Sequence, residues 1–147
     1  MNKKSILIII IVILILSVMI GGYLVSQNNI KVGDATFTLP EGYKCVANGK
    51  YANITNGNGY IILQCNESSN IAQVMDSYVK NNNEHNLSLS MSNLTLGKYT
   101  VYKSVMDNNT QIVHYWFNYD NKVYEIYTRS ADSNTDSIVK NLINSAK

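Results

Sequence analysis

One histidine in this sequence has carboxylates at a spacing that could support acid–base chemistry. His114 lies in an expected strand, and Asp107 and Glu125 are near enough in sequence to orient its ring. Hydrolases use a histidine held by a carboxylate as a general base. A strand histidine beside an aromatic residue, here Trp116, is more often an interior residue whose ring nitrogens bond to backbone or water. The sequence favours this second interpretation, so we expect no enzyme and no catalytic residue, with an envelope hydrolase based on His114 as the alternative.

Recognisable motifs for metals and cofactors are missing from the sequence. Its two histidines and two cysteines include no pair with a ligand spacing such as C-x-x-C. It also lacks the G-x-S-x-G and H-E-x-x-H motifs and a glycine-rich phosphate loop that opens a helix. We therefore predict no metal site and no cofactor.

The two cysteines, Cys45 and Cys65, form a candidate disulfide. A pair of cysteines in a domain outside the cell is commonly oxidised. The alternative is that both are small buried apolar residues in neighbouring strands and never bond. The sequence leaves the two alternatives open.

Aromatic residues are concentrated between positions 99 and 127 and form a candidate binding surface. Strand alternation places Tyr115 on one face with its neighbours at i+2 and i+4, and Trp116 on the other. Tyrosine offers a large amphipathic contact area, although cross-strand pairing within the sheet explains the same pattern. The candidate surface comprises Tyr115, Phe117, Tyr119, Tyr124 and Tyr127.

Five Asn-x-Ser/Thr sequences are candidate N-glycosylation sites. The chain is rich in asparagine, serine and threonine, so several such triplets are expected by chance. The candidates are Asn53, Asn66, Asn86, Asn93 and Asn108.

Residues 6–25 are apolar for long enough to cross a membrane. Twenty residues in a helix span about 30 Å, which is the thickness of the hydrocarbon core. A secretory signal peptide is the rival interpretation, but its apolar region is shorter and ends at a small-x-small cleavage site. Cleavage after Gly21 or Gly22 would place Met19 or Ile20 at the minus-three position, and both are too large. We expect an uncleaved anchor.

Lys3 and Lys4 favour a cytoplasmic N-terminus. They predict residues 1–5 inside, a transmembrane helix at 6–25, a polar stalk at 26–34 and an extracytoplasmic domain at 35–147, in a single-pass protein of the cell membrane. The formal charge of +2 comes from these two lysines, so the predicted outer domain is neutral. A neutral domain is a poor nucleic-acid binder, because binding to phosphates needs a basic face.

The predicted domain begins with strands and a helix. A strand at 35–39 ends at Pro40, and the sequence from Asn56 to Gly59 predicts a turn between strands at 50–55 and 60–65. Asn70 and Gln73 resemble a capping box, and apolar residues at helical spacing follow until three asparagines at 81–83 fray the helix.

The second half predicts a meander closed by a helix. The strands are expected at 87–96, 99–106, 111–119 and 122–129, with Asp120 and Asn121 as a two-residue type I′ turn, and the helix at 135–146. Short loops force antiparallel pairing, and the two amphipathic helices must cover the sheet. The fold class is therefore α+β, an antiparallel sheet flanked by amphipathic helices.

The element order and one short motif resemble PsbP-like domains. The motif is a strand that ends in a Pro-x-Gly-aromatic turn, at Thr36-Phe37-Thr38-Leu39-Pro40-Glu41-Gly42-Tyr43. The whole outer domain is similar in order to the membrane-anchored PsbP-related proteins of methanogenic archaea. This resemblance implies an α/β/α sandwich that serves mainly for binding and assembly at extracytoplasmic membrane faces.

The expected function is a binding or assembly module at the cell envelope. Its partners would be the membrane, through one helix, and an envelope protein or glycan that the sequence does not identify. Besides the hydrolase based on His114, a structural or adhesin-like surface protein remains as an alternative.

Overall fold

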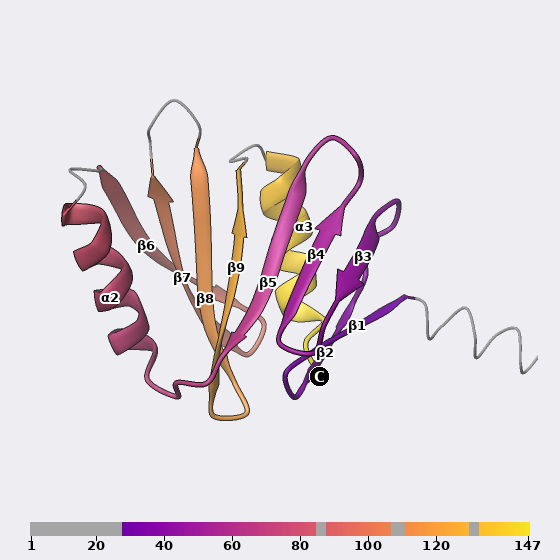
Figure 1. The fold of residues 1–147 in the computed structure, drawn as a ribbon, viewed down its shortest axis with the longest axis horizontal. Helices are drawn as coiled ribbons and strands as arrows, with labels where there is room; N and C mark the ends of the chain where they lie inside the picture. Colours follow the sequence, from indigo (N-terminus) through magenta and orange to yellow (C-terminus); the bar gives the residue numbers. More distant parts are fainter. Residues whose placement is uncertain (1–27, 85–87, 107–110, 130–132) are drawn as a thin grey trace, which may run out of the picture.

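The computed structural model describes residues 28–84, 88–106, 111–129 and 133–147, and shows mainly antiparallel sheet with two helices (Figure 1). The α+β class is therefore confirmed. The predicted cytoplasmic segment 1–5 and transmembrane helix 6–25 lie outside the described residues. Within the described ranges, no helix combines the length and apolar character needed to cross a membrane.

The main sheet has seven strands among the described residues, in the order β3-β4-β5-β9-β8-β7-β6, and every pair is antiparallel. The pairing of β5 with β9 joins the N-terminal strands to the C-terminal meander. The strands are β3 Lys44–Ala47, β4 Tyr51–Thr55, β5 Tyr60–Asn66, β6 Leu89–Leu96, β7 Tyr99–Met106, β8 Ile112–Tyr119 and β9 Lys122–Thr128.

A separate hairpin, β1 Asn29–Val32 with β2 Ala35–Thr38, corrects the predicted stalk. Ile30 and Val32 are buried in the hydrophobic core, so this segment is part of the domain rather than a polar spacer. The sequence prediction was wrong here because the polar residues that flank Ile30 hid a strand of only four residues.

Helix α2, Ile71–Glu84, lies against one face of the sheet (Figure 1). Its start is capped as predicted, because the Gln73 amide donates to Asn70 Oδ1 at 3.2 Å. The predicted fraying at 81–83 is wrong, since the helix continues through all three asparagines. Asn82 is buried and donates its side-chain amide to the Tyr78 carbonyl, which binds this asparagine to the helix itself.

Helix α3, Ser133–Asn144, covers the opposite face together with the β1–β2 hairpin. The main core lies between these elements and the sheet. The C-terminus is attached to β2, because Thr36 and Lys147 exchange two backbone hydrogen bonds. The largest fully buried side chains of this core are Phe37, Ile54, Ile61, Leu63, Tyr115, Phe117, Tyr124, Ile126, Leu142 and Ile143.

The turn between β8 and β9 has the predicted geometry. Asp120 and Asn121 both have positive φ values, 46° and 59°. Two central residues with positive φ are characteristic of the type I′ turn, which matches the twist of the flanking strands. This turn sets the register that places Trp116 opposite Glu125 and His114 opposite Tyr127.

Candidate functional site

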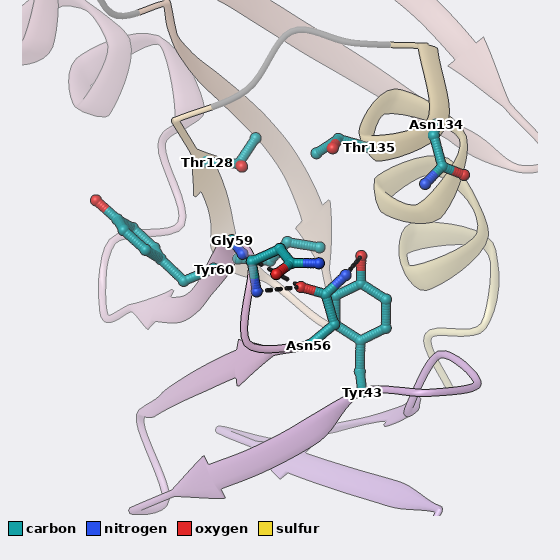
Figure 2. Close-up of a pocket in the computed structure, with 9 residues that line it drawn as sticks. Tyr43, Asn56, Gly59, Tyr60, Thr128, Asn134 and Thr135 are labelled. Carbon is teal, nitrogen blue, oxygen red and sulfur yellow. Dashed lines mark hydrogen bonds between the residues drawn. The ribbon is translucent and has the colours of Figure 1, made fainter.

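A small polar pocket lies where the β4–β5 turn approaches the end of β9 and the start of α3 (Figure 2). Its volume is about 190 Å³. None of the side chains that line it carries a formal charge. The lining residues are Tyr43, Asn56, Asn58, Gly59, Tyr60, Ile61, Thr128, Asn134 and Thr135.

The lower wall of the pocket is organised by Asn56. Its Oδ1 accepts hydrogen bonds from the Asn58 amide at 3.0 Å and the Gly59 amide at 3.2 Å, and its Nδ2 donates to Tyr43 Oη at 3.3 Å. Thr55 Oγ1 accepts from the Gly57 amide and donates to the Gly59 carbonyl. The amides of this turn are therefore used within the turn, and they do not form a cradle for an anion.

The upper wall carries hydroxyl and amide groups. Figure 2 shows the side chains of Thr128, Asn134 and Thr135 above Asn56 and Tyr43, with the pocket between them. The ring of Tyr60 points away from this space, and the Arg129 guanidinium lies 5.8 Å from its centre. An uncharged set of hydroxyls and amides suits a neutral ligand that both donates and accepts hydrogen bonds.

A larger open groove of about 750 Å³ adjoins the polar pocket. It shares Tyr43, Asn56 and Asn134 with the pocket and runs between the 39–43 turn and α3. Leu39, Pro40, Ile138 and Leu142 contribute apolar groups to its lining, and Glu41 is the single charged lining residue. The groove is lined by Thr38, Leu39, Pro40, Glu41, Tyr43, Asn56, Asn134, Ile138, Asn141, Leu142 and Ser145.

His114 and Glu125 are brought together under α2, on the face opposite the main core. His114 Nδ1 and Glu125 Oε1 are 2.5 Å apart, and Gln64 Nε2 donates to Glu125 Oε2 at 2.6 Å. The ring of Tyr78 from α2 lies over His114, with centroids 4.5 Å apart. Asp107, the other predicted partner, lies outside the described residues. The histidine is therefore held by a carboxylate, as a general base would be, but it is also enclosed by aromatic rings.

Three polar atoms around this pair are buried and make no hydrogen bond of good geometry: Tyr78 Oη, Ser104 Oγ and Trp116 Nε1. Ser104 faces His114 across β7 and β8, yet it has no contact with solvent. Burial raises the pKa of Tyr78. The interaction of its hydroxyl with the Ser104 side chain opposes this shift, and the negative charge of Glu125 reinforces it. Because its hydroxyl is fully enclosed, Ser104 is poorly placed to attack a substrate.

A second charged cluster centres on Asp136 at the start of α3. Asp136 Oδ1 accepts from Lys103 Nζ at 2.8 Å and Tyr115 Oη at 2.7 Å, and its Oδ2 lies 2.6 Å from Lys140 Nζ. Burial alone would raise the pKa of Asp136, but these hydrogen bonds outweigh it and hold the pKa below its usual value of 3.8. Burial and the bond to Asp136 raise the pKa of Tyr115. This cluster fastens α3 to the sheet.

The structure does not contain the candidate disulfide, because Cys45 and Cys65 are both free. Cys45 is opposite Ile54, which is opposite Ile61, four positions before Cys65 on β5. The two residues are therefore separated by roughly 10 Å across the sheet and roughly 13 Å along it, too far for a bond. Burial raises the pKa of Cys45, which keeps it protonated as a thiol.

The predicted aromatic binding surface is wrong for most of its members. Tyr115, Phe117 and Tyr124 are almost completely buried, and Tyr119 packs against the same core. The opposite face of β8 is also covered, since Trp116 lies under Tyr78. The sequence shows alternation but not which face is covered, and here both faces are. Only Tyr127 is on the other face and half-exposed.

The candidate glycosylation sites differ in accessibility. Asn93 is exposed on β6, whereas Asn53 lies in β4 with its Oδ1 buried. The Asn66 side chain accepts a hydrogen bond from the Ser68 amide. Asn86 and Asn108 lie outside the described residues. Among the described sites, Asn93 is therefore the one whose side chain is open to modification.

The polar pocket joins residues that the sequence did not connect. Tyr43 was noted only as the last residue of the motif at 36–43, and Thr128 and Asn134 were not singled out. The three come from segments far apart in the chain, so no local pattern connects them. The turn from Asn56 to Gly59 was visible as a turn, but its approach to α3 was not. Among the described residues, no three His, Cys, Asp or Glu side chains are arranged to hold a metal ion.

Comparisons with known proteins show similarity in fold alone. No family model and no curated protein matches this sequence. A crystal structure of a protein from Bacteroides thetaiotaomicron is similar, with a TM-score of 0.56 and 12% sequence identity. The similar region covers 82% of this chain and 48% of the other, so this chain spans about half the length of that protein.

Proposed function

We propose that this chain is a single-pass membrane protein that carries a PsbP-like binding domain on the extracytoplasmic side of the membrane. Residues 6–25 are its anchor, and Lys3 and Lys4 set its orientation. The domain binds or assembles with a component of the cell envelope. The resemblance to PsbP-like domains is supported by the motif at 36–43 and by the order of the elements.

The polar pocket is the observation that carries the binding function. Its hydroxyl and amide groups come from two turns, β9 and α3, and the hydrogen bonds of Asn56 connect Tyr43 to the β4–β5 turn. No lining side chain is charged. A neutral ligand rich in hydroxyl groups, such as a sugar unit of an envelope glycan, matches this chemistry.

Asn134→Ala combined with Tyr43→Phe tests this site. We expect the pair of substitutions to weaken binding of neutral oligosaccharides about thirtyfold, because two hydrogen bonds of about 1 kcal/mol each are lost. The measurement is retention of full-length protein, in mild detergent, on an array of immobilised neutral and anionic oligosaccharides. Asn118→Ala, an exposed asparagine on β8, is the matched control and should bind as the wild type does. Equal binding by all three proteins, or none by the wild type, would exclude the pocket as a glycan site.

A hydrolase is the second candidate, because His114 and Glu125 are in direct contact. The binding function instead gives this pair a structural role. It predicts that His114→Ala destabilises the domain by about 2 kcal/mol, through lost packing and an uncompensated carboxylate. Thermal unfolding followed by circular dichroism measures this loss. Unchanged stability together with loss of an esterase or amidase activity on model substrates would favour the hydrolase.

A further inference from the structure

We infer that the 39–43 turn and the adjoining groove rest in the lipid headgroup layer of the membrane that holds the anchor. This inference rests on the proposed anchor and deepens it, because it specifies which surface of the domain meets the membrane. It concerns the groove between the 39–43 turn and α3, which the resemblance and the comparisons leave unassigned.

Only a short length of chain connects the proposed anchor to the domain. The anchor ends at residue 25 and β1 begins at Asn29, so residues 26–28 are the whole connection. The four Cα–Cα steps from residue 25 to Asn29 span at most about 14 Å. The headgroup layer on each side of a bilayer is about 6 Å thick. The first strand must therefore begin within or just outside the headgroups.

The beginning of β1 is rigidly connected to the 39–43 turn. The Leu39 amide donates to the Asn28 carbonyl at 2.7 Å, and Asn29 is opposite Thr38 in the β1–β2 ladder. The hairpin does not swing away from the domain, because Ile30 and Val32 are buried in the core. Whatever holds Asn28 near the bilayer also holds Leu39 there.

The chemistry of this surface suits the interface of a bilayer. Leu39, Pro40, Tyr43 and Ile138 are half-buried and present apolar groups along the groove. Tyrosine is enriched at membrane interfaces, where its ring is apolar and its hydroxyl is hydrated. Glu41 is the single charged side chain in the groove lining. The contact is therefore driven by apolar burial and does not require anionic lipid.

This orientation has a consequence for the binding site. The polar pocket shares Tyr43, Asn56 and Asn134 with the groove, so it opens close to the membrane surface. Helix α2 and strand β6 lie at the other end of the sheet from β1 (Figure 1). A ligand of the pocket would have to be reached at the membrane surface, while α2 points toward the surrounding envelope.

The test uses full-length protein in phosphatidylcholine vesicles that contain a lipid with a nitroxide on its headgroup. A fluorophore is attached at Glu41→Cys or, as the control, at Asn83→Cys on α2, both in a background of Cys45→Ser and Cys65→Ser. Both labelled positions are exposed. A third protein carries Glu41→Cys and a flexible Gly/Ser insertion of about ten residues after residue 26. Circular dichroism melting confirms that each variant is folded.

We expect the fluorophore at position 41 to be quenched several-fold more strongly than that at position 83, and the insertion to reduce the difference. Equal quenching at both positions in protein that stays with the vesicles after an alkaline carbonate wash would overturn the inference and leave the anchor intact. Protein that the wash removes from the vesicles would overturn the anchor and, with it, this orientation.

Discussion

Gly33→Ala is expected to destabilise the domain by about 3 kcal/mol. Gly33 has a φ of 60°, in the left-handed region that residues with a side chain rarely adopt. A Cβ at this position would lie 2.6 Å from Cys65 Sγ and 2.8 Å from Tyr124 Oη. The left-handed backbone costs about 1–2 kcal/mol and overpacking adds about 1–3 kcal/mol. Thermal unfolding of the full-length protein in mild detergent measures the combined loss.

The close approach at Gly33 also explains why the effect should be large. The Tyr124 hydroxyl accepts hydrogen bonds from the amides of Asp34 and Ala35, both at 3.1 Å, and therefore cannot move without losing them. Burial and a hydrogen bond with Cys65 raise the pKa of Tyr124 to about 12, so the hydroxyl stays protonated at neutral pH.

Gly42→Ala is the matched control for this substitution. Gly42 has a φ of 78°, but a Cβ there would meet no atom within 4 Å. It should cost about 1 kcal/mol, from the backbone alone. Equal destabilisation by the two substitutions would show that the β1–β2 turn does not pack tightly against Cys65 and Tyr124. It would also contradict the placement of this hairpin in the core.

Asp136→Asn is expected to destabilise the domain by about 2 kcal/mol. The carboxylate accepts from Lys103, Lys140 and Tyr115, and its side chain is 18% exposed, so solvent screens it only in part. The substitution leaves two ammonium groups near an amide that cannot balance their charge. Glu67→Gln is the control: its ion pair with Lys50 is 65–72% exposed, and its loss should produce no measurable change. Equal effects would show that the Asp136 cluster does not fasten α3.

The same residue predicts how stability depends on pH. The pKa of Asp136 is held below its usual value in the folded protein, so the folded state binds fewer protons there than the unfolded chain does. Its contribution is complete above the usual pKa of about 4 and decreases as the pH falls further. The stability difference between the wild type and Asp136→Asn should therefore narrow on acidification below pH about 4. A constant difference would contradict the role of the carboxylate charge.

The parts of the fold that depend on local sequence were predictable. The strands predicted at 99–106, 111–119 and 122–129, the turn at Asp120 and Asn121, and the cap at Asn70 each depend on residues near in sequence, and the structure confirms them. Strand β1 was missed because four residues provide too little periodicity. Alternation in β6 would by itself predict one buried apolar face, yet Met91 is 40% exposed, because β6 is an edge strand of the sheet.

The candidate site was much less predictable than the fold. The pairing of β5 with β9 brings Gln64 to Glu125, and no pattern in either strand indicates it. The same long-range pairing places Thr128 beside the β4–β5 turn, and α3 then adds Asn134. Alternation identified two aromatic faces on β8 but could not show that a helix covers each one. Most of the aromatic side chains that the sequence predicted to form a binding surface are therefore buried.

The most direct test of the account is the intact mass of the native protein extracted from membranes. An anchored binding domain predicts recovery in the membrane fraction with a mass that retains residues 1–25. The separation of Cys45 and Cys65 predicts that alkylation of the unfolded protein without prior reduction modifies both thiols. Reduction before alkylation should therefore add no further alkyl groups to the mass. Recovery in the soluble fraction, with the mass of a chain that begins beyond residue 20, would contradict the anchor. It would also contradict the position of this domain at the membrane surface.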